Sequence, residues 1–171
     1  MTLADLNRMD RAQFVAALRG VVEHSPWVAE GAFAAHPFGS ADALHAAMMR
    51  VIAGAGEARQ LALIRAHPEL AGKAAVRSAL TADSAAEQSG AGLDCCSPAE
   101  FARLGELNAR YDARFGFPFI LAVKGYDRAG IIAEFARRVD NDRATEFAEC
   151  LQQIARIARL RLASLLDAED A

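Results

Sequence analysis

The 171-residue chain has only three cysteines, and they follow no disulfide or zinc pattern. Cys95 and Cys96 are adjacent, which is a poor arrangement for an ordinary disulfide, and Cys150 leaves an odd number. None of the four histidines has zinc-type spacing with another histidine or a cysteine. We therefore expect a reducing compartment and inert thiols. A nucleophilic cysteine is the alternative, but no histidine is close to Cys95 or Cys96 in sequence.

Several signatures of other protein classes are also missing. The chain has no apolar run of membrane-spanning length, no basic tract, no glycine-rich phosphate loop, no G-x-S-x-G elbow and no dinucleotide fingerprint. Its net charge is −3 and its pI about 5.8. Residues 1–5 do not resemble a secretory signal, and residues 167–171 carry no peroxisomal tripeptide. We expect a cytoplasmic protein with no metal, no cofactor, no nucleic-acid partner and no membrane partner.

Helical periodicity recurs through most of the chain, in which 53% of the residues are hydrophobic. Apolar residues at three- and four-residue steps predict an all-α fold: one domain over residues 1–171, a bundle of about eight helices. The expected helices cover residues 10–22, a segment starting at Ser25-Pro26, residues 41–53, 57–66, 98–115, 129–139 and 142–166, and a short helix around residues 84–88.

Residues 115–125, with the sequence FGFPFILAVKG, break this pattern. The segment is too short and too proline-interrupted for a helix, so we expect one short extended buried segment. Buried backbone N–H and C=O groups need partners. A flat polar heterocycle could supply them, and neighbouring loops are the slightly favoured alternative.

An apolar helical run ends at His67, which Pro68 follows directly. Proline disfavours the α conformation for the residue before it, so His67 is expected to be the last residue of a helix or the first outside it. A histidine fixed on such a corner suits proton transfer near neutral pH. A histidine that merely caps the helix end is the alternative.

Two further sites combine polar groups with helical spacing. Ser84, Glu87 and Gln88 fall on one face of a short helix, although Ser-x-x-Glu is also the capping-box signature, with Gly90 and Gly92 then ending the helix. In the last expected helix, apolar residues recur at alternating steps of four and three residues and form a stripe, and the next step in that series falls on Arg161. It needs an anionic partner, which could be Glu87, another carboxylate or a ligand carboxylate, unless it lies at the stripe edge with its head in water.

Taken together, the chain resembles the 2-oxo-4-hydroxy-4-carboxy-5-ureidoimidazoline (OHCU) decarboxylases of urate degradation over nearly its whole length. The motifs that carry the resemblance are SPWVAE at 25–30, AHPELAGK at 66–73, SAAEQ at 84–88 with AGL at 91–93, LN-x-x-Y at 107–111 and FGFPFI at 115–120. The family often has Arg-Pro-Phe where this chain has His36-Pro37-Phe38, so we assign no role to His36.

The resemblance implies an all-α homodimer that releases CO2 from OHCU and yields (S)-allantoin without a cofactor, the last step from urate to allantoin in purine catabolism. It implies that His67 is catalytic, with Glu87 beside it. The substrate contacts that it implies are Pro68, Ser84, Glu87, Gln88, Phe119, Ile120, Leu121, Ala122, Val123 and Arg161. A non-catalytic helical binding or assembly module, or an inactive family member, is the alternative.

Overall fold

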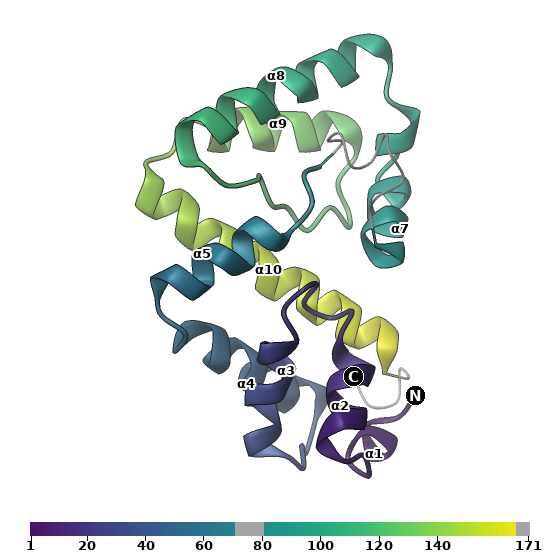
Figure 1. The fold of residues 1–171 in the computed structure, drawn as a ribbon. Helices are drawn as coiled ribbons and strands as arrows, with labels where there is room; N and C mark the ends of the chain where they lie inside the picture. The colour runs from purple at the N-terminus through teal and green to yellow at the C-terminus, as the bar shows by residue number, and fades with distance from the viewer. Residues whose placement is uncertain (71–80, 167–171) are drawn as a thin grey trace. The chain divides into compact units, whose positions relative to one another are not determined.

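Helices are the regular secondary structure of residues 1–70 and 81–166, the ranges that the computed structural model describes (Figure 1). The α-helices in these ranges are α1 (Leu3–Leu6), α2 (Arg11–Leu18), α3 (Pro26–Ala32), α4 (Ala41–Ala53), α5 (Glu57–Ala66), α7 (Ala82–Gly90), α8 (Pro98–Phe115), α9 (Arg128–Arg138) and α10 (Arg143–Leu165), with 3-10 turns at Phe33–Ala35 and Leu93–Cys95. The all-α prediction is confirmed.

The predicted helix limits agree with the structure to the residue for α4, α5 and α8, and within a few residues for α2, α9 and α10. Local capping explains the agreement. Ser40 accepts a hydrogen bond from the N–H of Ala43 at the start of α4, and Ser97 forms a capping box with Glu100 ahead of α8. The four-residue helix α1 was not predicted.

The chain divides into two compact units. One holds Met1–Ala66 together with the chain from Ile154 onward, and the other holds His67–Gln153. Helix α10 contributes its first half to the second unit and its remainder to the first. The single domain over residues 1–171 stays a prediction.

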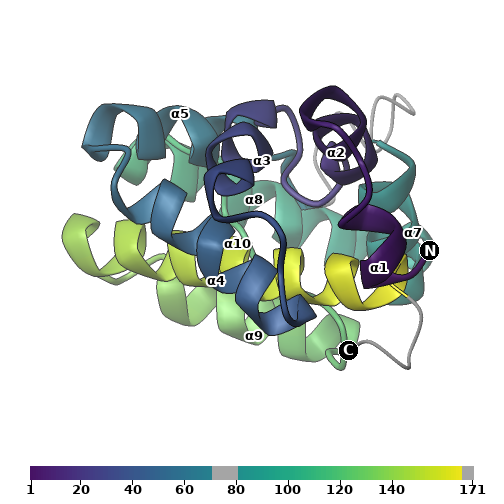
Figure 2. The same ribbon diagram turned by 90° about the horizontal axis from the view of Figure 1, so that it is seen from below.

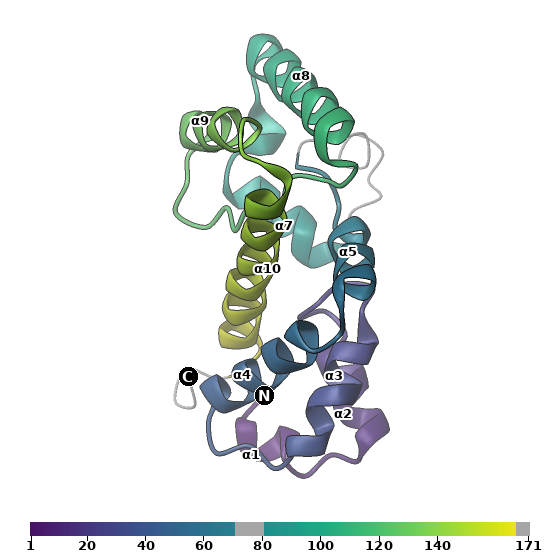
Figure 3. The same ribbon diagram turned by 90° about the vertical axis from the view of Figure 1, so that its left-hand side faces the viewer.

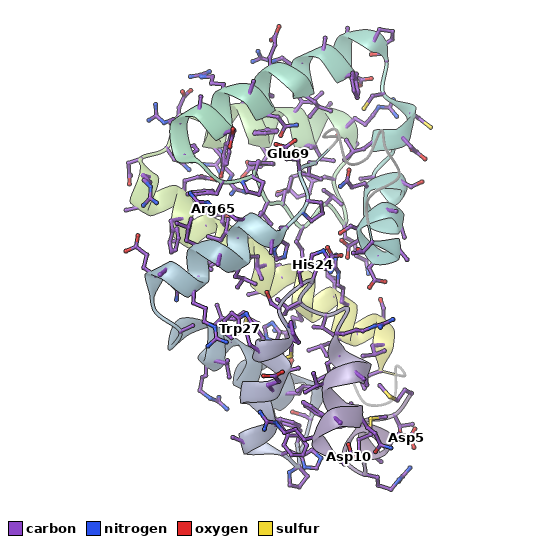
Figure 4. All side chains as sticks on the ribbon, viewed as in Figure 1. Asp5, Asp10, His24, Trp27, Arg65 and Glu69 are labelled. Atoms are coloured by element: carbon purple, nitrogen blue, oxygen red, sulfur yellow. The ribbon has the colours of Figure 1, made fainter. Side chains whose placement is uncertain are left out.

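In the first unit, α3 packs against both α2 and α4 (Figure 2). The Asn7 side chain ties the end of α1 to Phe38. Its Nδ2 donates to the carbonyl of Phe38 at 2.7 Å, and its Oδ1 accepts from the N–H of Phe38 at 2.9 Å. Arg59 of α5 lies over the ring of Trp27, 4.1 Å from its centroid. Trp27 is labelled in Figure 4.

In the second unit, α8 and α9 lie side by side (Figures 1 and 3). Between α8 and α9 the chain runs through residues 116–127, whose first part packs its rings against the two helices. Phe119 stacks on Phe135 of α9 with centroids 3.8 Å apart, and Tyr111 of α8 meets Phe119 edge-on at 5.5 Å. Residues 117–123 have neither helical nor strand structure, and most are buried. This confirms the expected buried non-helical segment.

We predict that Asn7→Ala lowers the free energy of unfolding by about 1–3 kcal/mol, because it leaves both backbone groups of the buried Phe38 without their side-chain partner. Urea denaturation followed by far-UV circular dichroism measures the change. Arg110→Ala is the control, since it removes only the exposed pair with Asp140 and should cost less than about 1 kcal/mol. Equal stability of the two variants would contradict the prediction.

Candidate active site

The His67 corner is tied to two helices of the second unit. Helix α5 ends at Ala66, so His67 is the first residue outside it, as predicted, and it is buried. The carbonyl of Glu69 accepts from Nε2 of Gln88 at 3.4 Å, and the carbonyl of Leu70 accepts from Nδ2 of Asn108 at 2.9 Å. The histidine is therefore followed by backbone that α7 and α8 hold in place. Residues 71–73 of the motif lie outside the described residues.

Helix α7 is capped by Thr81, whose side chain accepts from the N–H of Ser84 at 3.3 Å. Ser84 thus lies inside the first turn, and the interpretation of Ser84 and Glu87 as a capping box is wrong. The N-cap is Thr81, three residues before Ser84, and only its own side chain caps the helix. The helix ends at Gly90, and Gly92 follows with the left-handed φ of +73° that favours glycine.

Ser84 and Gln88 are buried, one turn apart on the same face of α7, while Glu87 is partly exposed. The hydrogen bond from Gln88 to the carbonyl of Glu69 joins this helix to the segment that carries His67 and Pro68. The His67 corner and the Ser84–Gln88 face therefore meet within one unit. Glu87 lies next to Gln88 on this same helix.

Two backbone groups of the Phe119–Val123 segment are held by side chains of helices. The carbonyl of Ile120 accepts from Nη1 of Arg138 at 2.8 Å. The N–H of Ala122 donates to Oε1 of Gln153 at 3.0 Å. The favoured expectation, pairing with neighbouring loops, is therefore wrong for these two groups. Sequence reasoning missed both partners, although each is a polar residue at an otherwise apolar position of its helix.

A buried carboxylate supports Arg138. Glu146 and Arg138 are both fully buried, and Oε1 of Glu146 accepts from Nε of Arg138 at 2.9 Å and from Nη2 at 2.5 Å. Glu146 also accepts from the hydroxyl of Tyr111 at 2.5 Å and from Nδ2 of Asn141 at 2.8 Å. Burial disfavours the charge of Arg138, but the hydrogen bonds and charge of Glu146 outweigh it, so the pKa of Arg138 is raised. The guanidinium remains charged.

Arg161 pairs with Glu23, so one of its partners is another carboxylate, one of the alternatives left open by the sequence. Nη1 of Arg161 lies 3.0 Å from Oε1 of Glu23 and donates to the carbonyl of Gly20 at 3.0 Å. The side chains are 9% and 2% exposed, which contradicts a head in open water. Glu23 and Arg161 both belong to the first unit, whereas His67 belongs to the second. The part that Arg161 takes in a site with His67 stays a prediction.

The three cysteines form no disulfide: Cys95 is exposed, Cys96 half-buried and Cys150 buried. Burial raises the pKa of Cys96, and it raises the pKa of Cys150 to about 11. A thiol with a raised pKa is mostly protonated near neutral pH and is a poor nucleophile. This disfavours the alternative of a nucleophilic cysteine at these two positions.

Within residues 1–70 and 81–166, no three histidine, cysteine, aspartate or glutamate side chains gather as a metal ion would require. In the same ranges, no helix has both the length and the apolar character needed to cross a bilayer.

Comparison with known proteins assigns the family. The family model described as OHCU decarboxylase matches residues 7–163. The chain belongs to the OHCU decarboxylase family. The OHCU decarboxylase of Haloferax volcanii is 43% identical over 169 residues, which are 99% of this chain and 98% of that protein.

Two solved structures share the fold of this OHCU decarboxylase family member. A crystal structure of (S)-allantoin synthase matches with a TM-score of 0.79 and 29% identity, over 98% of this chain and 55% of that chain. An OHCU decarboxylase crystallised in the presence of (S)-allantoin matches with a TM-score of 0.70 over 87% of this chain and 96% of that chain. Its identity is 21%, so that likeness supports the fold alone.

We predict that Arg161→Leu destabilises the protein by about 3–5 kcal/mol, because it removes the guanidinium that pairs with the buried carboxylate of Glu23. Arg161→Lys keeps a cation and should lose much less. Arg159→Leu is the matched control on the same helix, since its pair with Asp42 is exposed, and it should cost less than about 1 kcal/mol. Urea titrations of the three variants test this, and an Arg161→Leu protein as stable as Arg159→Leu would refute it.

Proposed function

We propose that this chain decarboxylates OHCU to (S)-allantoin without a cofactor, and that it protonates the product on one face. The observation that carries the proposal is the family match over residues 7–163, in a chain that keeps both His67 and Glu87. The Gln88–Glu69 bond, which joins α7 to the His67 corner, supports it. We further propose that the enzyme acts as a homodimer in the cytoplasm.

The substrate supplies its own electron sink. Its carboxylate lies β to a ring C=N group, so loss of CO2 pushes electrons into that imine. The enzyme must therefore hold the carboxylate out of the ring plane, stabilise charge on the ring and deliver one proton. A buried site favours all three, because it excludes water and strengthens electrostatic contacts.

We assign the proton donor to His67, whose ring donates to the carbon that becomes the stereocentre of allantoin. The burial of His67 keeps bulk water from competing for that carbon. Glu87 orients the imidazole and tunes its pKa, while Pro68, Ser84 and Gln88 contact the substrate. Backbone at Phe119–Val123 pairs with the ureido and ring edges, and Arg161 holds an anionic or carbonyl oxygen.

The direct test generates the unstable substrate in situ from urate and follows the chirality of allantoin by circular dichroism, with and without this protein. A decarboxylase gives faster formation of the (S) enantiomer. A helical binding module or an inactive family member gives the same slow racemic signal as buffer, and that result would overturn the proposal.

We predict that His67→Asn slows formation of (S)-allantoin by about 10²–10⁴-fold, the usual contribution of a general acid–base group. The same assay measures the rate. A chelator is present because we expect a reaction that needs no metal ion. His24→Asn is the matched control. His24, which is labelled in Figure 4, is exposed. Its φ is +54°, which asparagine tolerates well, so this variant should retain wild-type turnover. Near-wild-type activity of His67→Asn would remove His67 from the mechanism.

We predict that Glu87→Gln lowers turnover strongly while leaving the melting temperature nearly unchanged. Thr81 caps α7, so the Glu87 carboxylate is not needed to start the helix. Glutamine keeps the shape and loses the charge that would tune His67. Thermal unfolding and kcat are measured together, with Glu30→Gln on the exposed face of α3 as control. A lower melting temperature with unchanged kcat would assign Glu87 a structural role only.

A further inference from the structure

The backbone around Leu121 is fixed from one side. Arg138 of α9 holds the carbonyl of Ile120, and Gln153 of α10 holds the N–H of Ala122. These groups belong to residues on either side of Leu121. In an extended chain, the polar groups of residues i and i+2 face the same edge, while those of the residue between them face the opposite edge.

One face of α10 supports both anchors, since it carries Gln153 itself and the Glu146 that holds Arg138 of α9. Glu146, which holds Arg138, and Gln153 are seven residues apart, or two helical turns, so their side chains share a face. Both are almost completely buried. The anchored edge of the segment therefore faces this side of α10.

The Gln153 amide is aimed by its second contact. Its Nε2 donates to Oε1 of Glu149 at 2.7 Å, one turn earlier on the same helix. The carbonyl end is thereby turned toward the N–H of Ala122. An apolar side chain of the same size would fill the same space without fixing that peptide.

The stability of the core alone does not account for the buried Arg138–Glu146 ion pair. A buried ion pair gains little over well-packed apolar residues, because both charges lose their water. What it adds here is a directed donor at 2.8 Å from the carbonyl of Ile120. The same guanidinium lies over the ring of Phe119, 4.5 Å from its centroid, and so contacts two consecutive residues of the segment.

We propose that Arg138 and Gln153 are positioning residues of the decarboxylase: they hold the Ile120–Ala122 backbone by one edge, so that the opposite edge, with the peptide groups of Leu121, faces the substrate. This rests on the proposed function. Neither side chain reacts with the substrate. Their contribution is the register and the angle of the backbone that binds the ureido and ring edges.

Gln153→Met tests the proposal. Methionine keeps the length and the apolar packing and removes the acceptor for Ala122. We expect KM for OHCU generated in situ to rise about tenfold or more, equivalent to about 1.4 kcal/mol of binding, with a smaller change in kcat. Gln152→Met, at the exposed neighbouring position of α10, is the control and should retain wild-type KM.

Arg138→Lys is an independent second variant. Lysine keeps the ion pair with Glu146, so the protein is expected to fold, but it lacks the planar fork that reaches both Glu146 and Ile120. KM should rise as in Gln153→Met. If Gln153→Met does not fold, Arg138→Lys decides the question.

The outcomes separate the two proposals. A wild-type protein that forms no excess of (S)-allantoin refutes the proposed function. An active wild type, together with folded variants whose KM equals that of Gln152→Met, refutes the positioning role, even where their melting temperatures fall. A raised KM in a variant whose near-UV circular dichroism matches the wild type supports it.

Discussion

The buried carboxylate of Glu146 is the interaction on which the second unit depends. It gathers donors from α8 (Tyr111), from α9 (Arg138) and from Asn141 just before α10. Burial raises the pKa of Tyr111 well above its ordinary value, with Cys150 and Glu146 adding to the effect, so its hydroxyl remains a donor. Three consecutive helices thus meet at one charge, and through Arg138 that charge also fixes the carbonyl of Ile120.

The site follows from how that unit is held together. The chain leaving His67 is fixed by Gln88 and Asn108, and the segment after α8 is fixed by Arg138 and Gln153. Backbone without helix or strand must find partners for its polar groups elsewhere. In this family member, part of that requirement is met by buried side chains. The proposed chemistry uses the same irregular backbone to recognise a small polar ring.

Local signals made most of the fold predictable. Ser40 and Ser97 fixed helix starts, and Pro68 fixed the end of α5, because caps and proline act within a few residues. The prediction of the α7 cap failed because Thr81 and Ser84 are both residue types that cap helices, and the capping-box spacing to Glu87 favours the wrong one. Helical periodicity can mark Arg161 and Gln153 as polar residues at apolar positions, but it cannot identify Glu23 and Ala122 as their partners, because each pair joins distant parts of the chain.

The division of α10 between the two units has a consequence for synthesis on the ribosome. The second unit is continuous in sequence and can complete its contacts as soon as its last residues emerge. The first unit cannot, because Gly20 and its neighbour Glu23 meet a side chain that is added very late: Gly20 and Arg161 are 141 positions apart. The first part of the protein to be made is therefore the last to complete its contacts. Until Arg161 has been added, the carboxylate of Glu23 has no counter-charge from α10.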